Sequence, residues 1–372
     1  MRPRPHLPRT RRWRTLGVLL AVALSAFGWS YGGYLTAAGN APVAVRTVDW
    51  ARDHGFETVV DRAEQWWYTR SKPTGTRPSA QDLPPRSGTQ AVATTAAVPI
   101  PVVVHPARRG EGRWRVVDGL TSAPGSVQET FVRPDPGFPS VSAAVVRLDQ
   151  RATRLVFVPG LRQPGVGHWS WGSEIPPAVR PTVVAAFNAG FKFKDTRGGL
   201  YTEGRHTVRP LATGLASIVI HRDGTADVAD WGRDAHMSSD VVSVRQNLSL
   251  IVDHGRPVPG LLVDRGSKWG KLKSQFQFTW RSGLGVDREG RLLYVAGRRM
   301  TLTELAAALT DAGAVRGMQL DIHSDVVTFN WFRPVAGSAT AVRAAKLMPS
   351  MQLSATRYLR PDQRDFLAVL AR

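Results

Sequence analysis

An uncharged run of about twenty residues near the N-terminus, Thr15 to Leu35, constrains this chain more than any other feature. As a helix, the run is long enough to cross ~30 Å of hydrocarbon. Arginines without any acidic partner precede it, at Arg2, Arg4, Arg9, Arg11, Arg12 and Arg14, and they predict a cytoplasmic N-terminus. We therefore expect a basic cytoplasmic tail (1–14), a single-pass membrane anchor (15–35) and an extracytoplasmic remainder.

A cleaved signal peptide is the competing interpretation of this run. Its strongest apolar core, Leu16 to Phe27, is short, and Ala37 and Ala38 could supply small residues for a peptidase. The uncharged run extends past the usual length of such a core, and no A-x-A triplet closely follows it. The sequence therefore favours an uncleaved anchor.

Two further segments precede the globular part. Apolar residues recur at helical spacing from Ala44 to Tyr68, which predicts one or two amphipathic helices interrupted near Gly55. We expect a juxtamembrane helical segment at 36–68, whose Trp66-Trp67-Tyr68 cluster packs against the main domain or rests on the membrane. Residues 69–98 are rich in Pro, Ser, Thr and Gly, and they predict a linker through the cell wall or periplasm.

The remainder, 99–372, is predicted to be one globular, sheet-rich α+β domain, because many short apolar runs alternate with turn signals. Strands are expected at Arg113–Val117, Val127–Val132, Ala143–Asp149, Arg154–Pro159, Val183–Phe187, Ala216–His221, Asp227–Trp231, Leu248–Val252, Arg281–Val286, Leu292–Ala296 and Met318–Ile322. A capping box at Thr301 to Glu304 predicts one helix, which ends near Gly313. A second helix is expected from Pro361 through Leu370.

Composition excludes several classes of function. Without cysteine, the chain can hold no disulfide, thiolate metal site or cysteine nucleophile. No P-loop, dinucleotide fingerprint, HExxH or G-x-S-x-G motif is present. The formal charge of +20 suits an anionic polymer. We expect no nucleic acid as partner, because the chain lacks a basic helix or aromatic-interleaved strand.

The stretch from Val183 to Tyr201 is the first candidate for function. A short apolar strand enters a tight turn, where Asn188 lies next to a glycine at position 190. Lys192 and Lys194 add positive charge, which predicts a strand end that accepts anions. A plain hairpin turn with two solvated lysines is the alternative.

Several motifs follow this turn in a fixed order. They are Asn188-Ala189-Gly190-Phe191, the strand Arg281 to Asp287, the hairpin partner Gly290 to Val295, the helix start Thr301 to Ala306, and Leu320-Asp321. This order resembles the phosphodiester glycosidase family over roughly Val183 to Phe332. Arg245 to Leu248, Arg357 to Asp362 and Arg364 to Phe366 look similar to an actinobacterial membrane-anchored branch of that family.

The chain departs from the family pattern after Asp321. Ile322-His323-Ser324-Asp325 stands where the family has a glycine-rich turn, which puts the close backbone approach at that turn in doubt. Asp321, His323 and Asp325 alternate and would share one face if the strand continued that far. Such a set could bind a divalent cation, the one cofactor we consider, or could be a solvated strand end.

The resemblance implies hydrolysis of a sugar-1-phosphodiester at the anomeric carbon. We expect a membrane-anchored hydrolase that acts on envelope or exopolysaccharide glycans. The alternative is a non-catalytic binder of anionic cell-wall glycan that uses the same cleft.

The resemblance and the residue types together give a candidate site. The catalytic group comprises Asp321, Arg281, Asn188, Glu203 and His323. The substrate-binding group comprises Lys192, Arg245, Asn247, His206, Trp169 and Trp171. Asp321 is expected to act as general base or sugar-orienting carboxylate, and Arg281 as phosphate clamp, because a guanidinium matches phosphate oxygens. Competing interpretations are a strand-end salt bridge for Arg281, a surface charge for Arg245 and a core or rim pair for the two tryptophans.

Overall fold

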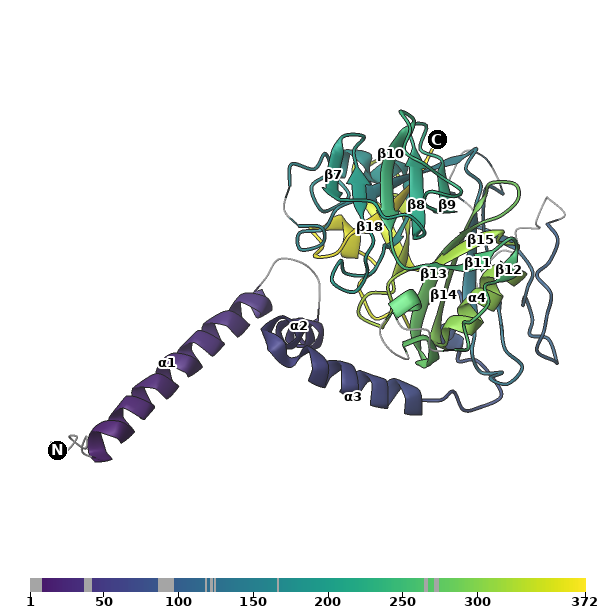
Figure 1. Ribbon diagram of the computed structural model, residues 1–372. Coiled ribbons are helices and arrows are strands. Elements are labelled where there is room, and N and C mark those ends of the chain that lie inside the picture. The colour runs from purple at the N-terminus through teal and green to yellow at the C-terminus, as the bar shows by residue number, and fades with distance from the viewer. Residues whose placement is uncertain are drawn as a thin grey trace.

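The computed structural model describes residues 9–36, 42–85, 97–117, 119–120, 123, 125–165, 167–263, 267–270 and 274–372. It has a body of antiparallel sheets with one helix packed on it, and a helical N-terminal segment whose first helix projects away from the body (Figure 1). The predicted sheet-rich α+β class is confirmed.

Three helices form the N-terminal segment: α1 (Arg9–Thr36), α2 (Val43–Ala51) and α3 (Glu57–Arg70). Within α1, Leu16–Thr36 is long and apolar enough to cross a membrane, judged by length and composition alone. A π-helical turn (Arg52–Phe56) joins α2 to α3, and Gly55 within it has a φ of +88°. The predicted interruption near Gly55 is therefore confirmed.

The body contains three sheets in which all strand pairs are antiparallel. The large sheet has the order β1 (Arg115–Val116), β2 (Val127–Val132), β3 (Ala143–Leu148), β14 (Leu292–Met300), β13 (Thr279–Val286), β15 (Arg316–Gln319), β11 (Leu250–Asp253), β12 (Arg256–Pro257). A second has the order β7 (His206–Arg209), β6 (Leu200–Thr202), β10 (Val241–Gln246), β8 (Ala216–His221), β9 (Ala226–Asp230). The third has the order β17 (Val342–Lys346), β16 (Phe329–Pro334), β5 (Val183–Asn188), β18 (Phe366–Ala371), β4 (Thr153–Val158).

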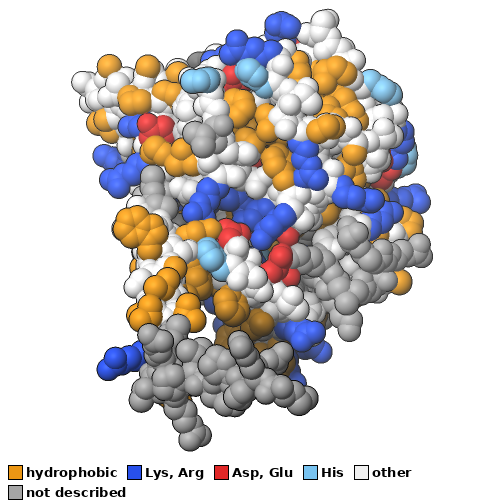
Figure 2. Space-filling view, turned by 60° about the vertical axis from the view of Figure 1, so that its left-hand side comes forward, with side chains coloured by type: hydrophobic (Ala, Val, Ile, Leu, Met, Phe, Trp, Pro, Cys, Tyr) orange, Lys and Arg blue, Asp and Glu red, His pale blue; other side chains and the backbone are white. Residues whose placement is uncertain are grey.

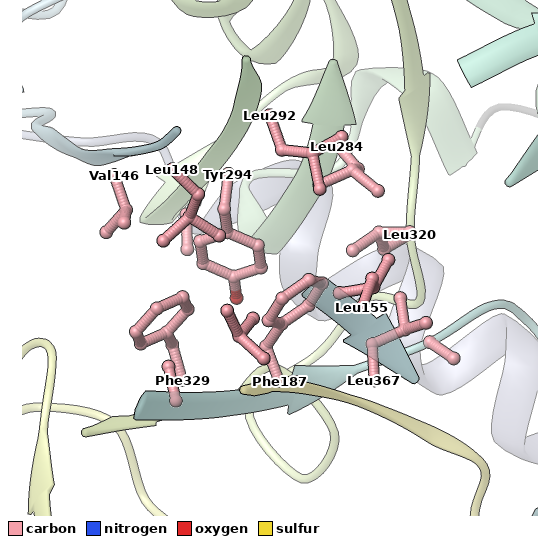
Figure 3. Packing of buried hydrophobic residues seen from close by; sticks show 14 of the residues in the cluster. Val146, Leu148, Leu155, Phe187, Leu284, Leu292, Tyr294, Leu320, Phe329 and Leu367 are labelled. Carbon is pink, nitrogen blue, oxygen red and sulfur yellow. The ribbon is translucent and has the colours of Figure 1, made fainter. Parts of the chain in front are cut away.

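The main core lies between the large sheet and the third sheet. Figure 3 shows Tyr294 and Leu284 of the large sheet pointing toward Phe187 and Phe329 of the third. The rings of Phe187 and Tyr294 have their centroids 4.9 Å apart. Burial of such aromatic pairs supplies both apolar area and specific ring geometry. The core therefore fixes the ends of β5 and β13 relative to each other.

Helix α4 (Leu302–Asp311) covers the opposite face of the large sheet. The predicted capping box is confirmed, because the Thr301 N–H donates to a Glu304 carboxylate oxygen (2.5 Å) and the Thr301 hydroxyl accepts from the Glu304 N–H. A side chain at Gly283 of β13 would lie 3.1 Å from Leu309, so the glycine lets this helix approach the sheet closely.

The second predicted helix is wrong. Phe366–Ala371 forms β18, a strand inside the third sheet between β5 and β4. All of its residues from Phe366 to Leu370 are buried. A strand covered on both faces has a continuous apolar run, and such a run does not differ from a short helix in its periodicity.

Part of the predicted linker contacts the body. The Ser142 hydroxyl donates to the Asp82 carbonyl (2.9 Å), and the Ser350 N–H donates to the Gln81 carbonyl (3.0 Å). Short 3-10 turns complete the structure at Ala80–Asp82, Pro177–Thr182, Ser267–Trp269, Ser274–Phe276 and Arg357–Leu359. The remainder of the linker, 86–96, and the peptidase site considered at Ala37 and Ala38 lie outside the described residues.

Candidate active site

A cavity of about 610 Å³ lies between the N-terminal helices and the body. This volume is in the range of ~300–1,000 Å³ that small-molecule sites occupy. Its floor comes from the turn after β5, the loop after β15 and the C-terminal loop before β18; α2 and α3 form its roof. On the face of the molecule in Figure 2, basic and acidic side chains lie side by side near the centre.

An ion pair between Asp321 and Arg364 lies on the floor. One Arg364 guanidinium nitrogen is 2.5 Å from the Asp321 carboxylate and also donates to the Gly190 carbonyl (3.1 Å). The other Asp321 oxygen accepts from the Ile322 N–H (2.8 Å). Within the described part of the chain, the buried Nε of Arg364 has no acceptor. Arg364 therefore has one donor that the described protein groups leave unpaired.

Lys192 reaches the roof instead of solvent. Its Nζ lies 2.5 Å from a carboxylate oxygen of Asp49 on α2. Lys194 behaves similarly, at 3.6 Å from Asp53 and 3.8 Å from Glu57. The two lysines that were predicted to accept an anion therefore pair with acidic side chains of the roof. A phosphate that binds Lys192 has to compete with Asp49.

His323 closes the far side of the floor against the roof. Its ring stacks on Tyr68 of α3 at 5.0 Å, and its Nδ1 lies 2.9 Å from the Thr279 hydroxyl. Burial lowers the pKa of His323 to about 3, although the charge of Asp321 opposes the shift. The imidazole is therefore neutral near pH 7 and can accept a hydrogen bond.

Where the family has a glycine-rich turn, this chain has a histidine with a left-handed backbone conformation. His323 has a φ of +79°, in the left-handed region that glycine adopts freely and most residues avoid. The chain thus holds a glycine-type backbone conformation at this point with a histidine, which costs local strain.

The strand does not continue to Asp325, since β15 ends at Gln319. Asp321 turns to Arg364 while His323 packs on Tyr68, so the expected common face does not form. Across the described ranges, no group of three His, Asp or Glu side chains is placed to hold a metal ion. Burial, with the charge of Asp49 adding to it, raises the pKa of Asp325.

A second arginine stabilises the C-terminal part of the floor. Arg357 pairs with both carboxylate oxygens of Asp362, at 2.6 and 3.0 Å, and donates to the Val326 carbonyl (3.0 Å). Sequence reasoning did not place Arg357, Asp362 or Arg364 in the site. The signal was present, because these residues belong to the tail motif that resembles the membrane-anchored branch.

Two of the predicted residues lie in a polar layer just beneath the floor. The Asn188 amide donates to the Ser282 hydroxyl (3.0 Å), and its oxygen accepts from the Thr328 N–H (3.2 Å). Asn247 accepts from the Phe191 N–H (3.1 Å) and donates to the Gln319 carbonyl (2.6 Å). Both are 1% exposed, and their contacts hold the floor loops together.

Arg281 and Arg245 belong to the same layer and do not line the cavity. Arg281 is fully buried and donates to the carbonyls of Met300, Ser274 and Gln277 and to the Gln319 side chain. Burial lowers the pKa of Arg281 to about 9. Arg245 pairs with Asp365 at 2.6 Å and donates to the carbonyls of Gln246 and Phe191. Both guanidinium groups bind protein acceptors.

The remaining predicted residues form a separate cluster that does not line the cavity: Glu203, His206, Trp169 and Trp171. The Trp169 and His206 rings meet edge to face at 5.7 Å. Glu203 accepts from the Ser170 N–H (2.6 Å), and Trp171 packs against the core beneath the third sheet. The structure therefore brings together Asp321, His323 and Lys192 and leaves these four elsewhere.

One segment of the body matches a known protein family. Residues 181–321 match the model of the phosphodiester glycosidase family. The matched segment begins just before β5, includes Asn188, Lys192 and Arg281, and ends at Asp321 on the cavity floor. The resemblance to this family is confirmed over that segment.

Solved structures with similar folds include the catalytic domain of zebrafish N-acetylglucosamine-1-phosphodiester alpha-N-acetylglucosaminidase, auto-inhibited by its pro-peptide. The match has a TM-score of 0.41 and 15% identity, over 70% of this chain and 87% of that one. A protein from Synechocystis matches with a TM-score of 0.37 and 14% identity, over 70% of this chain and 64% of that one. No curated protein sequence matches this chain.

Proposed function

We propose that this protein is a membrane-anchored, extracytoplasmic hydrolase that cleaves sugar-1-phosphodiester bonds in envelope or exopolysaccharide glycans. The cavity floor carries the proposal. There the family-matched segment ends in Asp321, next to Arg364 and in the same cavity as Lys192. A carboxylate that can activate water, with cations in the same cavity that can bind phosphate, suits hydrolysis of a glycosyl phosphodiester.

The reaction divides among these groups. Lys192 and Arg364 bind the phosphodiester and stabilise the negative charge that grows on it as the glycosidic bond breaks. Water forms a bond to the anomeric carbon while the bond from that carbon to the phosphate oxygen breaks. The electron pair leaves with the phosphate monoester. The Asp321 carboxylate takes the proton from water, and neutral His323 accepts a hydrogen bond from water or a sugar hydroxyl.

A non-catalytic glycan binder is the second candidate. The observation in its favour is the replaced glycine-rich turn, in which His323 packs on Tyr68 of the roof. A binder of this kind would retain phosphodiester binding in the same cavity and release no sugar.

The membrane location rests on α1 and its flanking charges. Its apolar part is long enough to span a bilayer, and the arginines before it favour a cytoplasmic N-terminus. A carbohydrate-processing domain on the outer side then meets envelope polymers.

The test measures release of reducing sugar by the full chain, with and without EDTA, from a panel of sugar-1-phosphodiesters and envelope polymers. Asp321→Asn is expected to abolish release, while Asp240→Asn, which changes an exposed carboxylate outside the cavity, leaves it unchanged. Loss of release in EDTA would assign a metal to the reaction. Binding without release by the unaltered protein would establish the glycan binder instead.

A further inference from the structure

Helix α3 has two different faces, and one of them contacts the body. Glu64 lies 3.8 Å from the His323 ring, and Tyr68 stacks on that ring. The Gln65 side chain accepts a hydrogen bond from Gln277 (2.8 Å). This inner face forms the roof of the cavity.

An exposed apolar stripe runs along the segment and consists of Phe56, Val59, Trp66 and Trp67, of which Trp66 also lines the cavity. Their exposed fractions are 51%, 65%, 54% and 61%. Spacings of three, seven and one residues place them along one side of the helix. Apolar side chains usually occur singly on a protein surface, and a contiguous row indicates a binding surface. Something apolar therefore covers this stripe in the working protein.

The apolar helix α1 identifies what covers it. Trp50 of α2 packs against Phe27 (4.6 Å) and Tyr31 (5.5 Å) of α1 and donates a hydrogen bond to Ser30 (3.0 Å). The roof is thus fixed to the outer end of the candidate membrane span. In Figure 1, α3 runs beneath the body on the side toward which α1 projects. A bilayer that α1 crosses lies next to α3.

The side chains around the stripe suit a lipid headgroup layer. Tryptophan is enriched where a membrane meets water, since its ring is apolar and its N–H polar. Arg62, Arg70 and Lys72 are exposed near the stripe, and the Arg70 guanidinium lies 4.8 Å above the Trp66 ring. Basic side chains of this kind attract anionic lipids.

On its helical side the cavity is lined by both charged and apolar side chains. Tyr34 at the end of α1, Val45 of α2 and Trp66 of the stripe all line it. Lys192 contacts Asp49, which lies one helical turn from Val45. A phosphate bound at Lys192 therefore lies near Val45, in the cavity that Tyr34 and Trp66 also line.

We propose that the apolar stripe lies in the interfacial layer of the bilayer that α1 crosses, and that the cavity takes its glycosyl phosphodiester from a lipid of that bilayer. This inference rests on the proposed hydrolase function. The sugar occupies the floor at Asp321, and the hydrocarbon chain passes Tyr34 and Trp66 into the membrane. Water adds to the anomeric carbon, the bond to the phosphate oxygen breaks, and the lipid phosphate monoester stays in the bilayer.

The position of the stripe can be measured directly, because the chain has no cysteine of its own. Full-length Val59→Cys, labelled with an environment-sensitive fluorophore, is reconstituted in vesicles of phosphatidylethanolamine and phosphatidylglycerol. Quenchers attached to the lipid chains are expected to quench this label. The matched control is Met237→Cys, an exposed apolar position on the body, whose label is quenched from the aqueous phase instead. Aqueous quenching at position 59, or protection by a second copy of the chain, would overturn the membrane assignment.

The substrate class is tested with two compounds that share one sugar phosphate. One is esterified to a long polyprenyl chain and embedded in the same vesicles; the other is a water-soluble hexyl ester. Val59→Gln with Trp67→Gln, which changes two stripe residues outside the cavity lining, is expected to lower turnover of the embedded compound about tenfold. Turnover of the soluble compound should not change.

The outcomes separate this inference from the function on which it rests. Hydrolysis of the soluble compound alone would overturn the lipid substrate and leave the hydrolase intact. Failure with both compounds would overturn the hydrolase and the lipid substrate together, and the label at position 59 would still decide where the stripe lies. An equal loss on both compounds in the double variant would mean that the stripe stabilises the roof and does not present the lipid.

Discussion

The polar layer beneath the cavity and the floor of the cavity use the same residue types in opposite ways. In the layer, Arg281 and Arg245 are at most 1% exposed and bind protein carbonyls and side chains. On the floor, Arg364 keeps an unused donor and Lys192 pairs only with a carboxylate of the roof. The motif residues inside the strands therefore hold the loops beneath the cavity together, and the residues at loop ends line the cavity.

The largest effect is expected for the buried arginine. Arg281→Met removes a guanidinium that donates to four protein oxygens. The Ser274 and Gln277 carbonyls then keep only a backbone N–H donor each among the described contacts. We expect the free energy of unfolding to fall by about 3–5 kcal/mol, as measured by urea denaturation. If the variant keeps its stability and loses sugar release, Arg281 binds phosphate and does not have a mainly structural role.

The floor lysine should behave in the opposite way. Lys192→Met removes a cation from the phosphate site, and sugar release is expected to fall by a factor of about 10² to 10³. The free energy of unfolding should change by less than ~1 kcal/mol, because the Lys192 to Asp49 pair is partly exposed. Steady-state kinetics and urea denaturation of the same sample check both values.

The matched control for this variant is Arg151→Met, which removes a cation from an exposed pair with Asp149. It should leave both release and stability unchanged. If Lys192→Met unfolds the protein as Arg281→Met does, the lysine belongs to the structural layer and the comparison fails.

Burial of His323 on the cavity floor should make the stability of the protein depend on pH. Its pKa is lowered from its ordinary value of 6.5 to about 3 by burial, so between these pH values the unfolded chain binds a proton that the folded chain does not. Stability should therefore rise with pH across this window, by up to ~1.4 kcal/mol per pH unit from this group. His323→Asn removes the titration and keeps a residue that tolerates positive φ.

The measurement is urea denaturation of both proteins at several pH values between 4 and 6.5. Groups that titrate in both, such as Glu304, whose pKa burial raises to about 7, largely cancel in the difference. The difference in the free energy of unfolding, natural protein minus variant, should increase as the pH rises. Parallel pH profiles would mean that the ring is hydrated and not buried under Tyr68.

Local signals in the sequence predicted the elements that depend on local contacts. The capping box at Thr301 satisfies the helix end from within four residues, so α4 was predictable. The interruption at Gly55 is a property of that residue's backbone freedom. The order of motifs identified the family over the segment that its model matches.

The features that the sequence did not predict depend on contacts between segments that are distant along the chain. Phe366 to Leu370 pairs with β4 and β5, and without those partners its apolar run fits a helix as well. Arg281 looked like a phosphate clamp because its acceptors come from other segments, up to 38 residues away along the chain. Arg364 reaches Asp321 across 43 residues, so neither motif alone showed the pair.

The smallest effect is expected at the roof, where Asp49 competes with phosphate for Lys192. Asp49→Asn keeps the shape of the side chain and removes the charge that Lys192 now pairs with. A partly exposed pair contributes about 0.2–1 kcal/mol, so phosphate should bind the variant roughly 1.4- to fivefold more tightly. Isothermal titration with inorganic phosphate measures this change, and Asp240→Asn is the control. Weaker phosphate binding in Asp49→Asn would mean that the carboxylate orients Lys192 for its ligand, and the roof would then be part of the site it covers.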